Sequence, residues 1–385
     1  MAVAVAFVLN GVAMAALLSR VPAVRDTLAL SAADLGLLLL ALSAGTLTAL
    51  PLSGVVVDRL GAGRTVLAAA LVVTAGFGVL GVGLTLTSTP VVAVGLAVYG
   101  AGTSSWDVAM NVEGAAVERR LGRTLMPRLH AGFSVGTVAG ALFGAAAARA
   151  GMPLQVQLAL IGPGCLLGAA LAVGRFLPAG RAPSSAESVV RGVSWAWRES
   201  RTLLIGLLVF AFALTEGIAN DWLALALVDG HDRSEAVGAL GYGTFAASMT
   251  AGRLVGGSLL DRLGRVPVLR GTALLALVGV SVVVVAGPLG WVLLGAVCWG
   301  VGASLGFPVG MSAAADEPAR AAGRVAVVSS IGYTAFLAGP PLVGFLADGF
   351  GLLRGLLVVT VAAGVGAVAA AAARAPLHVN EPFGR

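Results

Sequence analysis

Lysine is absent from this chain, and all 24 of its basic residues are arginine. Without a lysine, the chain cannot form a Walker-type phosphate loop, which excludes an ATP-driven function of that kind. Charged residues are also scarce, at 11% of 385 residues, whereas ordinary globular chains carry about 25%. The composition is that of a membrane protein.

Cysteine is nearly absent as well. Cys165 and Cys298 both lie inside apolar runs, so the sequence offers neither a disulfide framework nor a metal-binding spacing. Gly-x-Gly patterns are frequent among the 55 glycines, but they fall within long apolar runs and indicate close helix packing. We therefore expect no enzymatic activity, no cofactor and no metal.

The net charge of +6 could suggest a nucleic-acid partner. The arginines, however, sit in short loops between apolar runs, so we reject nucleic acid as a partner and expect a lipid bilayer instead.

Long apolar runs dominate the sequence, which is 58% hydrophobic. A membrane span needs about 20 mostly apolar residues, and on this basis the runs predict an all-α protein with twelve transmembrane helices. The first run has no basic region or cleavage site, so we predict a span and not a signal peptide. The predicted spans cover residues 2–20, 32–57, 65–86, 90–117, 126–149, 154–175, 202–228, 235–260, 266–286, 289–314, 325–347 and 351–373.

Residues 176–200 interrupt this pattern. Prolines, serines and arginines replace the apolar residues there, which predicts a linker that could end in a short interfacial helix around Trp195 and Trp197. The chain then divides into a first six-helix bundle, 1–175, and a second, 201–385.

Arginine is distributed unevenly between the two sides of the predicted topology. If both termini and the linker are cytoplasmic, most loop arginines fall on that side, and the opposite side receives only Arg20, Arg25, Arg149, Arg233 and Arg354. Because positive residues accumulate in cytoplasmic loops, we predict cytoplasmic termini.

A turn between spans two and three recurs between spans eight and nine, about 200 residues later. Each copy ends an apolar run with an acid, a base, a glycine and a further base. The two copies are Gly54-Val-Val-Val-Asp58-Arg59-Leu-Gly61-Ala-Gly63-Arg64 and Gly257-Ser-Leu-Leu-Asp261-Arg262-Leu-Gly264-Arg265. The Gly-x-Gly at 100–102 likewise matches 300–302, and Ser-x-Gly at 134–136 matches 330–332. The pattern predicts a tandem duplication.

Twelve spans, a central loop and this doubled turn resemble the major facilitator superfamily. Several stretches further resemble fucose-permease-like transporters and their poorly characterised bacterial inner-membrane relatives: Ser19-Arg20-Val21-Pro22, Asp107-Val-Ala-Met-Asn111, His130-Ala-Gly-Phe-Ser134, Glu216-Gly-Ile-Ala-Asn-Asp221-Trp222 and Gly332-Tyr-Thr-Ala-Phe-Leu-Ala-Gly-Pro-Pro341. The resemblance implies two bundles that rock around a central cavity, in the cytoplasmic membrane of a bacterium. It also implies a small-molecule solute bound near the midplane, and we expect a functional monomer.

Two features depart from the superfamily pattern. Ala62-Gly63 precedes Arg64, so the first basic cluster is thin. The stretch 136–144 within span five lacks the Gly-Pro element typical of drug–proton antiporters, and Gly-Pro-Pro occurs at 339–341 in span eleven instead. These departures make a drug antiporter less favoured.

An ionisable side chain at mid-bilayer costs at least about 2.5–3.5 kcal/mol, so each one needs a reason. Asp107 is predicted deep in span four with Asn111 four residues on, hence on the same helix face. We interpret Asp107 as a protonatable cavity residue and Asn111 as a solute contact. The alternative is a polar pair that only holds helices together.

Glu216, in the middle of span seven, is the second candidate for a proton site, and Asn220 shares its face. Asp221 is turned away and would form an outer-gate contact or a hydrogen bond. Trp222 is either an interfacial anchor or a platform for the solute.

His130 and Glu113 are predicted at comparable depth, where they form either a proton relay or a structural hydrogen bond. For Arg253 we favour a side chain that extends to the cytoplasm over a pair with a cavity carboxylate. Asn10 and Arg20 in span one are further candidates for solute contacts.

By the resemblance, Asp58 and Asp261 latch the cytoplasmic gate by pairing with an arginine of a neighbouring helix. A carboxylate near a helix N-terminus also gains about 0.3–1 kcal/mol. The alternative is a plain turn-capping role. The gate motif comprises Gly54, Asp58, Arg59, Gly61, Arg64, Gly257, Asp261, Arg262, Gly264 and Arg265.

Three functions are compatible with the sequence. The first is a secondary transporter of a small solute with protons as the coupling ion. The second is a proton-antiport efflux pump for drug-like or secondary-metabolite molecules. The third is a sensor or scaffold that binds a ligand without moving it. Carboxylates inside the membrane in both halves favour transport.

Overall fold

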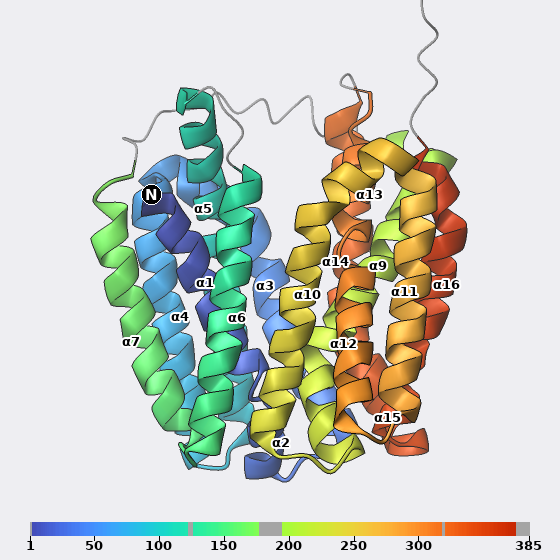
Figure 1. Cartoon of the computed structure of the whole chain (residues 1–385). Helices are drawn as coiled ribbons and strands as arrows, with labels where there is room; N and C mark the ends of the chain where they lie inside the picture. The colour runs from blue at the N-terminus through green and yellow to red at the C-terminus, as the bar shows by residue number, and fades with distance from the viewer. Residues whose placement is uncertain (1, 122–125, 177–194, 318–319, 375–385) are drawn as a thin grey trace, which may run out of the picture.

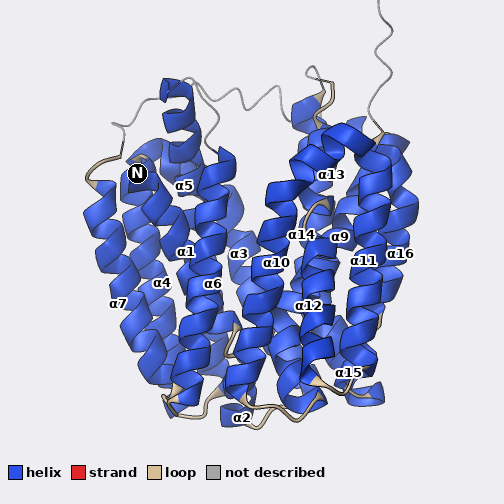
Figure 2. Cartoon of the chain, in the orientation of Figure 1, coloured by secondary structure: helices blue, strands red, loops and turns tan. Residues whose placement is uncertain are grey.

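The computed structural model describes residues 2–121, 126–176, 195–317 and 320–374. Within these ranges every regular element is helical (Figure 2), and the predicted all-helical fold class is confirmed.

Seven helices make up the first half of the chain. They are α1 (Ala2–Leu18), α2 (Val21–Leu28), α3 (Ala32–Leu60), α4 (Ala62–Thr85), α5 (Thr89–Leu121), α6 (Met126–Arg149) and α7 (Leu154–Val173). The second half contains α9 (Ser200–Leu225), η1 (Ala226–Gly230), α10 (Glu235–Leu263), α11 (Arg265–Val285), α12 (Leu289–Ala303), α13 (Gly306–Ala314), α14 (Ala321–Phe350), α15 (Leu352–Gly355), α16 (Val358–Ala369) and η2 (Ala370–Ala373).

The short elements extend or interrupt longer ones, so each half contains six long helical segments near the positions of the predicted spans. Ten of the described helices are long and apolar enough to cross a membrane. The two long helices outside that set are α5 and α10. They are the helices that carry Asp107 and Arg253, so polar residues reduce the apolarity of the helices that hold the candidate site.

The repeated turn has the same geometry in both halves. Gly61 ends α3 with φ of 81°, and Gly264 ends α10 with φ of 79°. Side chains rarely tolerate this backbone conformation, so glycine allows the chain to reverse without a loop between two spans. The predicted tight turn is therefore present twice.

Small residues bring the helices into backbone contact. A Cβ atom added to Gly136 of α6 would lie 2.0 Å from the carbonyl oxygen of Val8 in α1. Without a hydrophobic drive between helices in lipid, such close approach supplies much of the packing energy. The abundance of glycine therefore supports the packing of the bundle.

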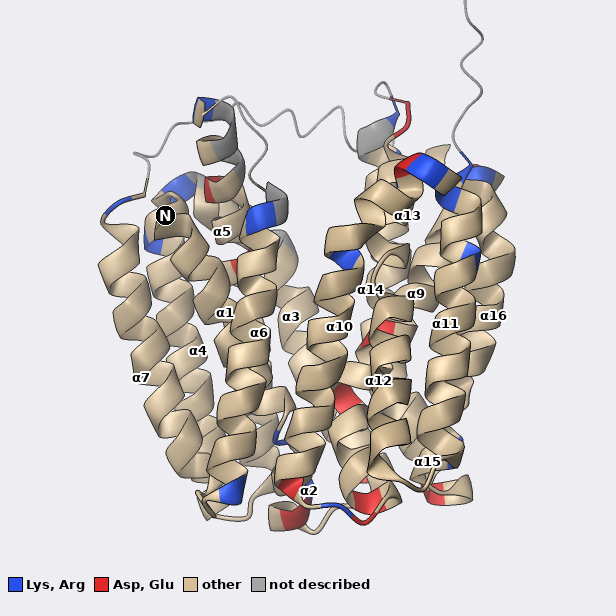
Figure 3. Cartoon of the chain, viewed as in Figure 1, with Lys and Arg blue, Asp and Glu red and all other residues tan. Residues whose placement is uncertain are grey.

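The two halves converge at one end and diverge at the other. Both ends of the described chain lie at the diverging end, whereas α2 lies at the converging end (Figure 1). Contact between the halves is made chiefly by α3 with α14 and by α6 with α10. Arginines gather at the diverging end, whereas acidic residues occur at both ends and inside the second half (Figure 3). The orientation of these ends in the membrane stays a prediction.

Candidate functional site

Asp107 lies in the interior of α5, about 21 Å along the helix from Leu121 at 1.5 Å per residue. Its side chain is nevertheless exposed. Asn111, one turn on, donates from Nδ2 to the backbone oxygen of Asp107 at 2.8 Å and to its Oδ1 at 3.2 Å. The spacing of four residues produces the shared face that the sequence predicted.

Electrostatic interactions connect Asp107 with two further side chains. His130 of α6 acts on the Asp107 carboxylate. That carboxylate in turn acts on Tyr333 of α14, in the opposite half. Residues of both halves therefore take part in the electrostatics at this position.

Arg253 and Glu216 form an ion pair between α10 and α9. The Nη2 atom of Arg253 lies 3.1 Å from Oε2 and 3.3 Å from Oε1 of Glu216. Its Nε atom donates to the carbonyl oxygen of Ser304 at 3.2 Å. The favoured prediction, that Arg253 extends to the cytoplasm, is wrong: the partners of its guanidinium lie inside the second bundle.

The break between α12 and α13 provides that carbonyl. Ser304 follows the last residue of α12, and α13 begins at Gly306. A carbonyl at the end of a helix has no partner within the helix, so the break makes an acceptor available to Arg253.

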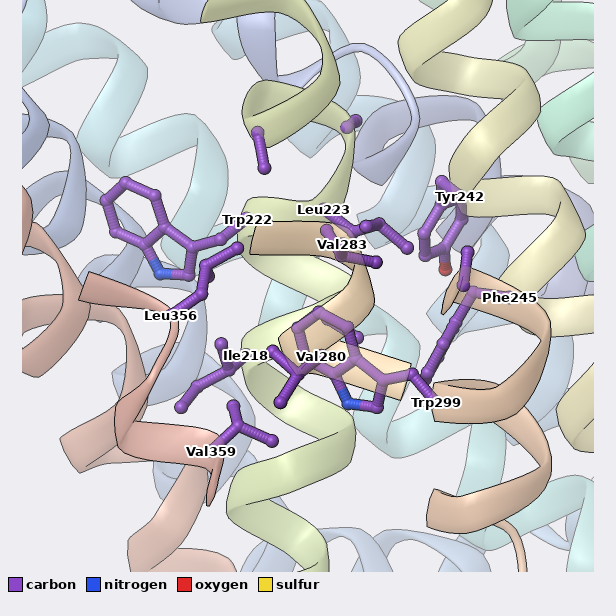
Figure 4. Close-up of a cluster of buried hydrophobic side chains, with 14 of the residues drawn as sticks. Ile218, Trp222, Leu223, Tyr242, Phe245, Val280, Val283, Trp299, Leu356 and Val359 are labelled. Carbon is purple, nitrogen blue, oxygen red and sulfur yellow. The ribbon is translucent and has the colours of Figure 1, made fainter. Parts of the chain in front are cut away.

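Trp222 is fully buried in the core of the second bundle, close to Leu356 and Ile218 (Figure 4). Neither predicted role, interfacial anchor or solute platform, fits that position. Both roles require a polar contact of the indole N–H at an interface or with a solute, whereas the buried Nε1 of Trp222 has no hydrogen-bond partner among the described residues.

Asp221 and Asn220 are half-buried on α9. The Asp221 carboxylate acts electrostatically on Tyr242 of α10, whose buried hydroxyl has no hydrogen-bond partner among the described residues. The outer-gate contact and the hydrogen bond predicted for Asp221 both stay predictions.

Arg20 is buried at the converging end, away from Asp107. It donates from Nη1 to Oε1 of Gln157 at 2.8 Å, and its Nη2 lies 3.1 Å from Oε2 of Glu235 in the second half. Protein groups engage both Nη atoms of Arg20 in this state, whereas its buried Nε has no hydrogen-bond partner among the described residues. The solute contact predicted for Arg20 stays a prediction. Asn10 is also buried, with Nδ2 3.9 Å from the sulfur of Met110 and an Oδ1 atom that lacks a partner in the described part of the chain.

His130 is exposed on α6, and its ring centroid lies 5.2 Å from that of Phe7. Glu113 is buried on α5. His130 acts electrostatically on Asp107. The proton relay or structural hydrogen bond between His130 and Glu113 stays a prediction.

In the repeated turn of the second half, Arg265 is the residue that forms ion pairs. Its Nη1 lies 2.8 Å from Oδ1 of Asp316, which also pairs with Arg201 at 2.8 Å. Asp261 and Arg262 are exposed and form no ion pair with any residue that the structure describes. The predicted gate contact of Asp261 is therefore not formed with any described arginine, and this agrees with the divergence of the two bundles at this end. In the first half, Arg59 and Arg64 are exposed, and the side chain of Asp58 lies outside the described part.

Two surface hollows of about 330 and 340 Å³ lie outside the positions of Asp107, Glu216 and Arg253, and the second adjoins the first copy of the repeated turn. One is lined by Phe77, Gly81 and Gln155 between α4 and α7, and the other by Leu60, Arg64 and Phe176. The first is apolar and faces the perimeter of the bundle, so we base the candidate site on the polar groups between the bundles.

Sequence reasoning missed Tyr333, Tyr242, Ser304 and Gln157. Gln157 had a usable signal, because it is a polar residue within the apolar run at 154–175. Tyrosine and serine are common in spans, so the other three gave no signal without the packing of the helices.

Comparison with known proteins identifies the family. A model of the Major Facilitator Superfamily matches residues 3–333 and 205–383. An uncharacterized MFS-type transporter of Yersinia pestis is 34% identical over 373 residues, which cover 94% of each chain. An uncharacterized transporter of Sinorhizobium fredii is 34% identical over 354 residues, which cover 90% of each chain.

Solved structures share the fold. The nucleoside transporter NupG superposes with a TM-score of 0.78 at 14% identity, over 97% of this chain and 98% of that one. FucP in its outward conformation gives 0.66 at 17% identity, over 96% and 97%. From the family match and the two full-length bacterial relatives, this chain belongs to the Major Facilitator Superfamily and is a multi-pass membrane transporter.

Proposed function

We propose that this protein is a secondary active transporter that moves a small solute across the bacterial cytoplasmic membrane, with protons as the coupling ion. In this proposal the diverging end faces the cytoplasm, and the structure corresponds to the state that is open on that side. Asp107 is the main proton site.

The observation that carries the proposal is the position of Asp107. A carboxylate far from either end of its helix is costly in a membrane and is kept when it has a function. Asp107 is exposed, His130 acts on its carboxylate, and the carboxylate acts on Tyr333 of the opposite half. A group in this position can exchange a proton with the side to which the bundles are open.

The internal repeat supports a functional role. In the register that matches the glycines at 100–102 and 300–302, Asp107 corresponds to Phe307. If the six-helix fold needed a carboxylate at this point for packing, both halves would be expected to carry one. The asymmetry therefore favours a role at the site over a role in helix assembly.

Glu216 is a weaker candidate for the coupling site than the sequence suggested. Its charge is compensated by Arg253, so a proton on Glu216 would have to compete with an arginine. Asp107 has no arginine partner among the described residues. We therefore assign coupling to Asp107 first.

The test is proton movement driven by a solute. Proteoliposomes that contain a pH-sensitive dye are challenged with a panel of small polar solutes, and internal pH is followed for wild type, Asp107→Asn and the exposed-loop control Asp232→Asn. Wild type and the control should show solute-dependent pH changes, whereas Asp107→Asn should lose them and keep solute exchange at equal pH. A normal pH response in Asp107→Asn would refute the assignment, and no flux of any solute in wild type would favour the sensor or scaffold.

A further inference from the structure

We propose that Arg253 binds the carboxylate group of the transported solute, which would make small monocarboxylates the substrate class. This inference rests on the proposed transport function. It is carried by the geometry of the Arg253–Glu216 pair, by the exposure of Arg253, and by the groups arranged beside it.

The ion pair leaves part of the guanidinium unused. Both contacts to Glu216 use the single atom Nη2, and Nε is engaged by Ser304. Nη1 forms no hydrogen bond with any residue that the structure describes. In a fork-to-fork arrangement, a carboxylate uses two parallel nitrogens, and this pair does not. Arg253 can therefore accept a further carboxylate or exchange Glu216 for one.

The pair is also accessible. The Arg253 side chain is 35% exposed and that of Glu216 is 17% exposed, although Arg253 is about 15 Å along α10 from Leu263 at 1.5 Å per residue. A guanidinium held only for structural reasons at that depth would be expected to be enclosed by its partners. Partial exposure instead leaves room for a ligand atom.

The repeat again distinguishes function from architecture. Helices α3 and α10 are both 29 residues long and end in the same turn. When α3 and α10 are aligned from end to end, Arg253 corresponds to Leu50. The fold therefore does not require an arginine at this point.

A group of aromatic side chains follows the carbonyl that Arg253 contacts. Phe307 lies three residues beyond Ser304 in the chain, and its ring is 6.3 Å from that of Tyr333, which is 6.4 Å from Phe336. Tyr333 in turn interacts with Asp107. A solute with its carboxylate on Arg253 would place its body against this aromatic cluster and its hydroxyl groups toward Asp107 and Asn111.

Binding would involve exchange at Glu216. Among the described residues, Arg253 is the ion-pair partner of Glu216, and the Glu216 and Asp221 carboxylates both act electrostatically on Tyr242 of α10. None of these groups adds a second positive charge beside Arg253. A solute carboxylate and the Glu216 carboxylate would therefore compete for one guanidinium, and removal of the Glu216 charge should favour the solute.

The experiment measures binding to purified full-length protein without any gradient. Ligand-dependent shifts in melting temperature are recorded for small monocarboxylates, each paired with its neutral primary amide, such as benzoate with benzamide and lactate with lactamide. Acids but not amides should stabilise wild type. Glu216→Gln should bind the same acids about tenfold more tightly, Arg253→Lys should retain weak binding, and Arg253→Gln should lose it.

Three results would overturn the inference: amides that stabilise as well as acids, acids that stabilise Arg253→Gln as well as wild type, or no stabilisation of wild type by any acid. If Arg253→Gln does not fold, the acid affinity of Glu216→Gln provides the test. The inference predicts tighter binding of acids in that variant, whereas a purely structural ion pair predicts no gain when its carboxylate is removed. These binding results do not depend on proton coupling. Failure of the proposed proton-coupled transport can therefore be distinguished from failure of the proposed carboxylate site.

Discussion

Arg20 at the end of α1 and Glu235 at the start of α10 join the two halves of the protein by an ion pair of 3.1 Å. The Arg20 side chain is 4% exposed, and Gln157 holds it from the first half. A second pair nearby links Arg25 to Asp229, with Nη2 2.7 Å from Oδ1. These contacts lie at the converging end, where they oppose separation of the bundles.

Removal of the Glu235 charge should therefore open this end. Glu235→Gln leaves Arg20 buried without its anionic partner, and loss of a hydrogen bond to a charged group typically costs about 1.5–3 kcal/mol. Spin labels at Thr27 and Asp232 should report a longer distance. The control Arg354→Gln removes an exposed charge at the same end and should leave the distance unchanged. An unchanged distance in Glu235→Gln would mean that the pair does not contribute to closure.

A glycine contact closes the same end. A Cβ atom on Gly36 of α3 would lie 2.5 Å from the carbonyl oxygen of Pro340 in α14. Gly36→Ala should therefore disfavour the converged arrangement and lengthen the same label distance. Gly78→Ala is the matched control, because no atom lies within 4 Å of its added Cβ. Equal distances in the two variants would contradict this role for Gly36.

Topology can be tested by cysteine accessibility. After replacement of Cys165 and Cys298, single cysteines are introduced at Ser185 in the linker and at Asp232. Because arginines concentrate on the linker side, we expect an impermeant reagent to label only Asp232→Cys from outside intact cells. Labelling of both from outside would reverse or refute the orientation.

An ion pair connects Glu199, at the end of the linker, to Arg324 of α14. Arg324 donates from Nε and Nη2 to Glu199 at 2.7 and 2.6 Å, and the ring of Trp195 lies 5.6 Å from the Arg324 guanidinium. Burial raises the pKa of Glu199, but the hydrogen bonds from Arg324 and Thr202 outweigh it, so the pKa is lowered overall.

A carboxyl group with a lowered pKa in the folded state stabilises the protein above its unfolded pKa, and that contribution is lost as pH falls through the folded pKa. Glu199→Gln should therefore lower the melting temperature at neutral pH, for a loss of about 1.5–3 kcal/mol. The difference from wild type should shrink below about pH 4.5, the ordinary pKa of glutamate.

Glu317→Gln is the control, since Glu317 is 47% exposed and lies 3.4 Å from the same arginine. It should have little effect, because exposed ion pairs contribute little. A difference between wild type and Glu199→Gln that stays constant down to acid pH would exclude an ionic role for Glu199.

Patterns that depend on a single helix were predictable from the sequence. The spans follow from apolar length, the two turns from Gly61 and Gly264, and the shared helix face of Asp107 and Asn111 from a spacing of four residues. Contacts between helices were not, because they depend on how far one helix is rotated and shifted against another. The ion pair between Arg253 and Glu216 is an example, because it forms only when α10 packs against α9 in one particular rotation and shift. Trp222 was misplaced because an apolar pattern does not distinguish a bundle core from a lipid-facing surface.

The central claim is that the bundles rock around Asp107 under the control of a proton. The most direct measurement is a pair of spin-label distances in one protein, Leu60 to Leu263 at the linker end and Thr27 to Asp232 at the other, recorded as pH is varied. We predict that one distance shortens as the other lengthens, and that Asp107→Asn abolishes the pH dependence of both. Distances that do not respond to pH, or that respond equally in Asp107→Asn, would contradict the account.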